Sequence, residues 1–130
     1  MIYISSIIFI IVLIIQSVLC TPFENNVIVK GKAFCYNRNK QKSNHVKIIL
    51  MDKEVFGNHY IGEEIYYFLD DIEVDFSIAG RAREVSSLDP FVIFECLCGH
   101  VKKTKEVKLY EYGQNTKNSL YNININCSNY

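Results

Sequence analysis

The sequence lacks tryptophan, contains only two prolines among its 130 residues, and has no excess of either charge. Fourteen basic residues balance fourteen acidic ones, so no overall charge attracts the chain to nucleic acid or to an anionic membrane. Internal repeats and low-complexity tracts are also missing. The chain is instead rich in tyrosine (nine) and phenylalanine (eight), which favour β-strands. Its length and its 49% of hydrophobic residues fit one compact domain.

Motifs that carry catalysis are absent as well. The sequence has no Gly-rich phosphate loop, no Gly-x-Ser-x-Gly elbow and no paired carboxylates at a strand end. The histidines are expected to be solvated or locally bonded rather than general bases: His45, His59 and His100. Asp70 and Asp71 come nearest to a metal cluster, but adjacent aspartates are typical of turns. We therefore expect no enzyme activity, no cofactor and no metal.

The first twenty residues carry no charged side chain, and Ile7 to Ile15 is an unbroken apolar run. That run has the length of a signal-peptide core and is short of the ~20 residues that a membrane-spanning helix needs. No lysine or arginine precedes it, so the free amino terminus must supply the positive charge. Residues 1–20 are predicted to be a signal peptide cut between Cys20 and Thr21, with an uncleaved anchor as the alternative. The remaining domain, residues 21–130, is predicted to be secreted, without a membrane span.

Cleavage at that bond leaves four cysteines: Cys35, Cys96, Cys98 and Cys127. An even number in a short exported chain predicts two disulfides. A zinc site is the alternative, but zinc sites more often use Cys-x-x-Cys spacing, and no histidine pair stands nearby. The α-carbons of Cys96 and Cys98 would lie about 6.6 Å apart on one strand, near the upper limit for a bridge. We therefore expect Cys35 and Cys127 each to bond one of these two.

The stretch from Ser87 to Gly99 predicts the central strand. A proline opens it, a run of Val, Ile and Phe follows, and a glycine ends it. Alternation over residues 91–98 predicts one face that points into the core: Val92, Phe94, Cys96 and Cys98. The other face contains a glutamate and is expected to be wetter: Phe91, Ile93, Glu95 and Leu97.

The same period-two alternation predicts six further strands: Val27 to Cys35, His45 to Asp52, Tyr60 to Phe68, Glu73 to Ile78, Lys102 to Tyr112 and Leu120 to Cys127. Polar connections are expected at Tyr36 to Asn44, Asp52 to Asn58, Ala79 to Ser87 and Gly113 to Asn118. No convincing amphipathic helix is present. The predicted fold class is all-β, an antiparallel sandwich of seven to eight strands stapled by disulfides.

Three groups of polar residues have two interpretations each. Lys102, Lys103, Lys105 and Lys108 form either a patch for an anionic partner or a solvated edge strand. Arg81 and Arg83 pair either with Glu84 or with a partner's carboxylate. Asn126 opens an Asn-Cys-Ser glycosylation sequon, which we expect to be unused because its central cysteine is predicted to be bridged.

Four segments, in order and at suitable intervals, resemble the nematode transthyretin-like family of secreted proteins: Val27 to Cys35, Val46 to Gly57, Leu88 to Phe94 and Tyr121 to Ile123. Together they cover nearly all of the predicted mature chain. The resemblance implies a transthyretin-like β-sandwich, secretion and, for most members, no known ligand. Some members are reported to act as extracellular bridging or signalling proteins, which includes binding phosphatidylserine on dying cells.

The chain also departs from the family pattern. Cys98 stands at the family's position at the end of the central strand, but the family's second cysteine would fall near Lys102 or Lys103, and this chain has Cys96 instead. The related hydroxyisourate hydrolases carry a C-terminal Tyr-Arg-Gly-Ser, which is missing here. The predicted function is a non-catalytic secreted protein that binds an extracellular protein or lipid. A hydroxyisourate-hydrolase-like enzyme and a carrier of a small hydrophobic ligand are the alternatives.

Overall fold

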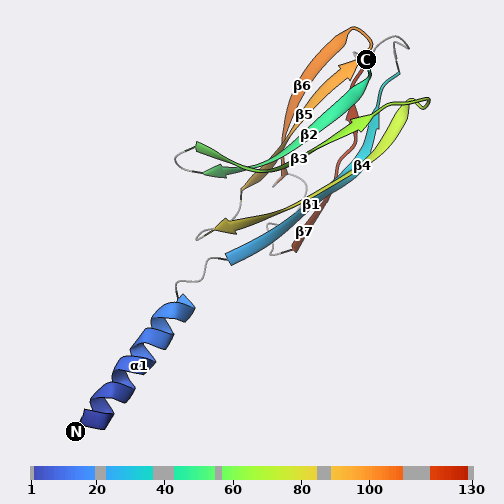
Figure 1. Ribbon diagram of the computed structural model, residues 1–130. Helices are drawn as coiled ribbons and strands as arrows, with labels where there is room; N and C mark the ends of the chain where they lie inside the picture. Colours follow the sequence, from blue (N-terminus) through green and yellow to red (C-terminus); the bar gives the residue numbers. More distant parts are fainter. Residues whose placement is uncertain are drawn as a thin grey trace.

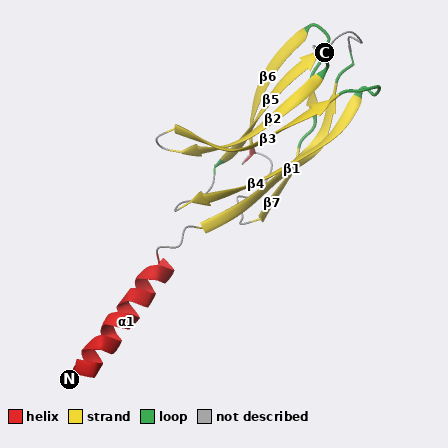
Figure 2. Ribbon diagram, in the orientation of Figure 1, coloured by secondary structure: helices red, strands yellow, loops and turns green. Residues whose placement is uncertain are grey.

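The protein is a two-layered β structure with one helix at its amino-terminal end (Figure 1). The computed structural model describes residues 2–19, 23–36, 43–54, 57–84, 89–109 and 118–128. Outside the helix α1 (Ile2–Leu19), strands make up most of the described chain (Figure 2). The C-terminus lies at the end of the strand layers that is remote from α1 (Figure 1).

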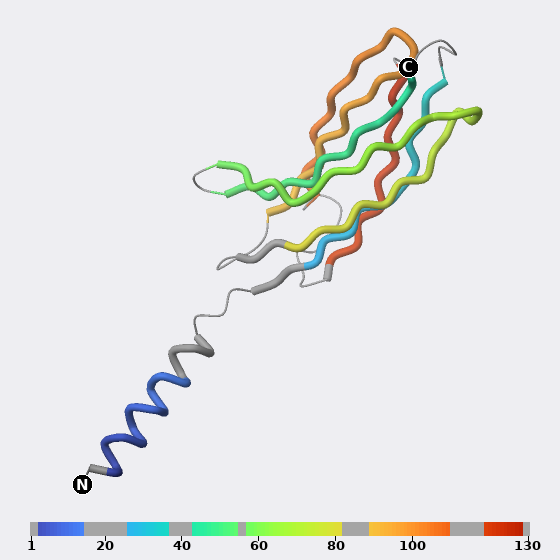
Figure 3. Tube along the Cα trace, viewed as in Figure 1, coloured from blue at the N-terminus to red at the C-terminus, as the bar shows by residue number. Residues whose placement is uncertain are grey.

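Two sheets form the layers. The first, here called the β5 sheet, is antiparallel and has the order β3 (Gly57–Tyr67), β2 (His45–Glu54), β5 (Pro90–Cys98), β6 (Val101–Lys108). The second, here called the β1 sheet, has the order β4 (Glu73–Glu84), β1 (Phe23–Phe34), β7 (Asn118–Asn122), and β8 (Ile125–Asn126) also pairs with β1. The tube in Figure 3 shows that strands far apart in sequence, such as β1 and β7, run side by side.

The core lies between the sheets and is built by alternating residues. On β2 the side chains of Val46, Ile48 and Leu50 are fully buried, as the alternation predicts. The rings of Phe76 and Phe94, one from each sheet, meet edge to face with centroids 5.6 Å apart. This contact joins the two layers near the middle of the core.

The predicted inward face of the central strand is confirmed, since Val92, Phe94, Cys96 and Cys98 are all buried. Phe91 was predicted to lie on the wetter face and hence to be exposed. This prediction is wrong, because the ring is buried. Phe91 lies at the strand end, opposite Met51 on one side and Lys108 on the other in the ladder.

The expectation of a wholly antiparallel sandwich is wrong for β7 and β8, which both run parallel to β1. Only strands joined by a tight hairpin must be antiparallel. Strand β7 follows β6, which belongs to the other sheet, so the chain enters the β1 sheet by a crossover that leaves its direction free.

The single strand predicted over Leu120 to Cys127 is interrupted at residues 123–124. There the N–H of Ile123 donates to the carbonyl oxygen of Lys30 at 2.9 Å. A Cβ at Gly31 would overlap the carbonyl oxygen of Ile123. Glycine at position 31 therefore lets the chain cross closely over β1 between β7 and β8.

Strands β1 and β4 are longer than predicted. Their ladder runs without interruption from Phe23 opposite Glu84 to Phe34 opposite Glu73. The prediction of a connection from Ala79 to Ser87 is therefore wrong for residues 79–84. Gly80 and the nearby charges resemble a loop in composition, but Gly80 faces inward, and a Cβ there would overlap the Cγ2 of Ile61 on β3.

Other boundaries differ by a few residues. Strand β3 begins at Gly57 with a φ of 132°, inside the predicted turn, and β6 ends at Lys108 rather than Tyr112. Gly99, with a φ of 63°, forms the turn between β5 and β6. Residues 37–42, 85–88 and 110–117 lie outside the described residues, so the predicted connections there stay predictions.

Helix α1 stands apart from the sandwich (Figure 1), and its side chains from Tyr3 to Ile14 are exposed. The segment predicted to be a signal-peptide core is therefore helical. Within the part of the chain that the structure describes, no helix meets the length and hydrophobicity needed to cross a membrane. The predicted cut between Cys20 and Thr21 lies outside the described residues.

Candidate functional site

The four cysteines predicted to form two disulfides do so. Cys35 is bonded to Cys98, with α-carbons 5.6 Å apart, and Cys96 to Cys127, with α-carbons 5.4 Å apart. The prediction that Cys96 and Cys98 take different distant partners is thus confirmed. Cys35 follows β1 and Cys127 follows β8, so both bridges tie the β1 sheet to β5.

A network of hydrogen bonds surrounds these disulfides and is called here the C-terminal clasp (Tyr36, Lys103, Asn126 and Ser128). Lys103 Nζ donates to the carbonyl oxygens of Asn126 at 3.0 Å and Ser128 at 3.4 Å. The fully buried Ser128 accepts the backbone N–H of Tyr36 on Oγ at 2.7 Å. Asn126 Oδ1 accepts the N–H of Ser128 at 2.9 Å, so the side chain of the sequon is engaged within the fold.

Strand β6 lies at the edge of its sheet, which confirms the predicted edge position. Its alternation divides the four lysines between the two sides of the strand. Lys103 and Lys105 share the side of the buried Val107, whereas Lys102 and Lys108 lie on the opposite side. Because Lys103 is held in the clasp, the lysines available to an outside partner are fewer than the sequence indicates.

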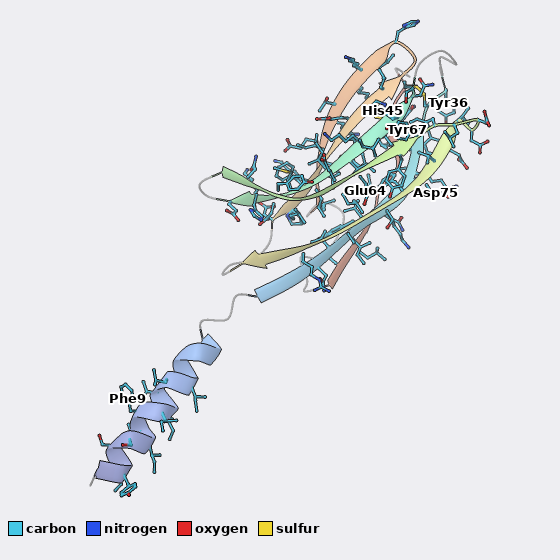
Figure 4. All side chains as sticks on the ribbon, viewed as in Figure 1. Phe9, Tyr36, His45, Glu64, Tyr67 and Asp75 are labelled. Atoms are coloured by element: carbon cyan, nitrogen blue, oxygen red, sulfur yellow. A yellow bond between two sulfur atoms is a disulfide. The ribbon has the colours of Figure 1, made fainter. Side chains whose placement is uncertain are left out.

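The remaining candidate residues are dispersed. A ring nitrogen of His45 lies 3.1 Å from the carbonyl oxygen of Ser43, and its ring packs beside Tyr67 (Figure 4). His59, His100 and Asp70 are exposed. The side chains of Arg83 and Glu84 lie outside the described residues. Among the residues described, no three His, Cys, Asp or Glu side chains gather to hold a metal ion.

A groove of about 430 Å³ lies on the outer face of the β1 sheet. Every lining residue belongs to β1, β4 or β7: Asn26, Val27, Ile28, Ala79, Gly80, Arg81, Ser119 and Leu120. The ladder aligns Ile28 with Ala79 on one side and with Leu120 on the other. These three residues, here called the aliphatic row, point away from the core, and Ile28 and Leu120 are 39% and 56% exposed.

Two cations flank the aliphatic row. Arg81 lies one row away toward the amino-terminal end, opposite Asn26, and Lys30 lies one row away on the other side, opposite Ser77. Successive rows on one face are about 6.6 Å apart along a strand. Among the described side chains neither Lys30 nor Arg81 forms an ion pair, and both are exposed. An apolar strip between two exposed cations suits a ligand that has an apolar part beside an anionic group.

Further along the same face, the charges are paired with one another. Lys32 Nζ lies 3.3 Å from Glu73 Oε1 and 3.7 Å from Asp75 Oδ1. The hydrogen bond to Glu73 and the charges of both carboxylates raise the pKa of Lys32 above its usual 10.5. Lys30 and Arg81 differ from this cluster, because within the described part of the chain no carboxylate pairs with either of them.

A buried carboxylate, Asp52, lies on the inner face of β2, opposite the first residue of β5. Asp52 is fully buried, and its Oδ1 accepts the backbone N–H of Asp89 at 2.8 Å. The N–H of Lys53 donates to the carbonyl oxygen of Asp89 at 2.9 Å. Asp52 thus fixes the entry to β5, while its Oδ2 has no partner among the described residues.

The aliphatic row was missed by the sequence interpretation because Ala79 to Arg81 was assigned to a connection. One signal was available: alternation in β1 places Ile28 on the same face as Lys30 and Lys32. A single exposed isoleucine is ordinary on a protein surface, so this signal alone does not identify a site. The other two members of the row depend on pairings with β4 and β7, which no local pattern specifies.

No protein-family model matches the chain, and no curated protein matches it. The groove and the C-terminal clasp are then the two features whose chemistry bears on function. The groups of the clasp are bonded to one another, whereas the groove presents apolar and cationic groups to solvent. The groove is therefore the candidate functional site.

Proposed function

We propose that this protein is a secreted, non-catalytic binding domain of transthyretin-like type that attaches to anionic lipid surfaces outside the cell. The single observation that carries the proposal is the aliphatic row, exposed between Lys30 and Arg81, which form no ion pair with a described side chain. Lipid surfaces present this combination, since anionic headgroups lie directly above apolar chains.

Magnitudes favour a surface with many headgroups over a single small ligand. Each basic residue near an anionic membrane contributes ~1 kcal/mol. Lys30 and Arg81 together thus contribute about 2 kcal/mol, and burial of part of the aliphatic row, at about 25 cal/mol per Å², adds about 2 kcal/mol more. A total of about 4 kcal/mol corresponds to a dissociation constant near 1 mM for one ligand. A membrane offers many ligands at a high local concentration and so turns weak contacts into attachment.

Three features support the other parts of the proposal. Two disulfides are typical of chains folded in an oxidising compartment, which supports secretion. Two sheets face each other across one core, as the transthyretin-like resemblance implies. Arg81 is the sole ionisable residue that lines the groove, within the described residues, and its planar guanidinium, which only donates hydrogen bonds, is suited to bind an anionic group.

The proposal is tested by vesicle co-sedimentation of the protein secreted from its full-length coding sequence, with its amino terminus determined by mass spectrometry. Vesicles contain phosphatidylcholine alone, or with phosphatidylserine or phosphatidylglycerol. We expect binding to both anionic compositions and a loss of binding at high salt. The double variant Lys30→Gln/Arg81→Gln should bind about thirtyfold more weakly, because two contacts of ~1 kcal/mol are lost.

Two further double variants distinguish binding at the groove from a general attraction of basic residues to anionic vesicles. Ile28→Ser/Leu120→Ser should weaken binding while leaving the fold intact, because both side chains are exposed. Lys102→Gln/Lys108→Gln removes two positive charges from β6, as many as Lys30→Gln/Arg81→Gln removes beside the groove, and should leave binding nearly unchanged. Equal weakening by the Lys102/Lys108 and Lys30/Arg81 variants would contradict the assignment to the groove. Hydrolysis of hydroxyisourate above background would contradict the non-catalytic assignment.

A further inference from the structure

Strand β4 lies at the edge of the β1 sheet, with β1 on one side and no strand of the described chain paired with the other. The outward backbone N–H and C=O groups of an edge strand form a template for another strand. Natural sheets protect such edges by charges, prolines, bulges or a covering segment. On β4, besides the charges of Glu73, Asp75 and Arg81, a described side chain of the opposite sheet covers part of the edge.

That side chain is Tyr66 on β3. Its hydroxyl donates to the carbonyl oxygen of Ser77 at 2.6 Å and accepts the backbone N–H of Ser77 at 3.1 Å. One phenolic oxygen can fill both roles at once. The Tyr66 ring is anchored in the core against Phe76, with centroids 6.4 Å apart. The hydroxyl thus occupies, at Ser77, the position that the backbone of a neighbouring strand would take.

The edge of β4 is self-complementary about this same residue. If two copies of β4 pair antiparallel with Ser77 opposite Ser77, Asp75 of each copy lies opposite Ala79 of the other. The next pair places Glu73, which also contacts Lys32 of its own copy, opposite Arg81, and the twofold symmetry repeats it. All of these residues share the exposed outer face of β4. Opposite charges at directly facing positions stabilise strand pairs and fix their register.

We propose that the outer edge of β4 is a self-association surface, that its partner is β4 of a second copy of this chain, and that the Tyr66 hydroxyl keeps it closed. The Tyr66 hydroxyl and an incoming strand compete for the same backbone groups of Ser77. Loss of the hydroxyl therefore opens the edge, while the phenyl ring that remains still fills its place beside Phe76.

The test is size-exclusion chromatography with light scattering on protein secreted from the full-length sequence, over a hundredfold range of concentration. Tyr66→Phe should show a mass that rises with concentration toward twice that of the monomer. The control is Tyr67→Phe, since the adjacent tyrosine is exposed and packs beside His45 instead of β4. The control should behave as the wild type. A Tyr66→Phe protein that elutes and scatters as the wild type throughout the range would overturn the proposal.

Charge reversal tests the pairing itself. In the Tyr66→Phe background, Arg81→Glu should abolish association, because Glu73 then faces a like charge. Adding Glu73→Arg should restore it. Association that persists unchanged with Arg81→Glu would show that another surface is used and would overturn the proposed partner strand. If Tyr66→Phe is not secreted, Tyr66→Leu retains apolar bulk, and it must show the same concentration dependence and the same response to charge reversal.

Discussion

The two ends of the sandwich hold their sheets together by different means. At the C-terminal end, two disulfides and the clasp connect β1, β5, β6 and the last described residues covalently or by hydrogen bonds. At the amino-terminal end, the described contacts between the sheets are packing contacts, such as Ile61 over Gly80, and Asp52 fixes the entry to β5. The groove lies at this second end. The covalent and hydrogen-bonded links described between the sheets thus lie away from the candidate site.

The largest expected effect comes from cutting the covalent links at the C-terminal end. Cys35→Ala/Cys98→Ala should lower the free energy of unfolding by about 4 kcal/mol, because the bridge closes a loop that restricts the unfolded chain. Its partners are 63 residues apart in sequence, against 31 for Cys96 and Cys127. In urea denaturation, the Cys96→Ala/Cys127→Ala variant should therefore lose slightly less unfolding free energy than Cys35→Ala/Cys98→Ala. The reverse order would indicate that native-state strain or packing outweighs loop entropy.

Two glycines allow the ends to be compared with the same substitution. Gly31→Ala should cost about 3 kcal/mol, because its Cβ meets a backbone carbonyl oxygen that is held in a hydrogen-bonded crossing. Gly80→Ala should cost about 1 kcal/mol, since its Cβ meets the Ile61 side chain, which can change rotamer. Thermal and urea unfolding measure both. Equal losses would mean that the amino-terminal end is packed as rigidly as the C-terminal end.

The clasp is expected to contribute less than either disulfide. Lys103→Met removes the donor to Asn126 and Ser128 but keeps the apolar stem, and should cost about 1 kcal/mol in unfolding free energy. The neighbouring Lys102→Met is the control, because Lys102 is exposed on the other side of β6. If both variants lose the same amount, the bonds of Lys103 add nothing measurable to the clasp.

The smallest expected effect is a pH dependence from the surface cluster on the β1 sheet. The folded-state pKa of Lys32 is raised above 10.5, mainly by the hydrogen bond to Glu73. The stabilisation is therefore fully present below pH 10.5 and is lost as the pH rises through the folded-state pKa. The difference in unfolding free energy between wild type and Lys32→Met should stay constant from pH 7 to 9 and shrink above pH 10.5. A difference that grows with pH would contradict this sign.

Sequence periodicity was sufficient where local geometry decides the outcome. The two-residue repeat of β5 placed Cys96 and Cys98 on one inward face, and the distance between them disfavoured a mutual bridge, so Cys35 and Cys127 were the expected partners, as the structure confirms. Sequence alone left open which of the two each would take. That choice depends on how β1 and β8 are placed opposite β5, a property of the whole fold.

Periodicity was insufficient where pairing overrides composition. Gly80 and Arg81 resemble a loop locally, but the long partner strand β1 continues the ladder through them. The aliphatic row depends on the register of Ile28 with Ala79 and with Leu120, residues that are far apart in the chain. A groove made by three strands cannot be seen until their order and offset are known.

The short spacing between α1 and β1 bears on the predicted removal of residues 1–20. Three residues separate the end of α1 at Leu19 from the start of β1 at Phe23, where β1 is already paired with Glu84. A cut between Cys20 and Thr21, as the sequence predicts, would leave only two residues before the ladder, and a protease needs an accessible, extended chain on both sides of the bond it cuts. If the prediction holds, cleavage comes before β1 enters its sheet, and the bond between Cys35 and Cys98 forms after both.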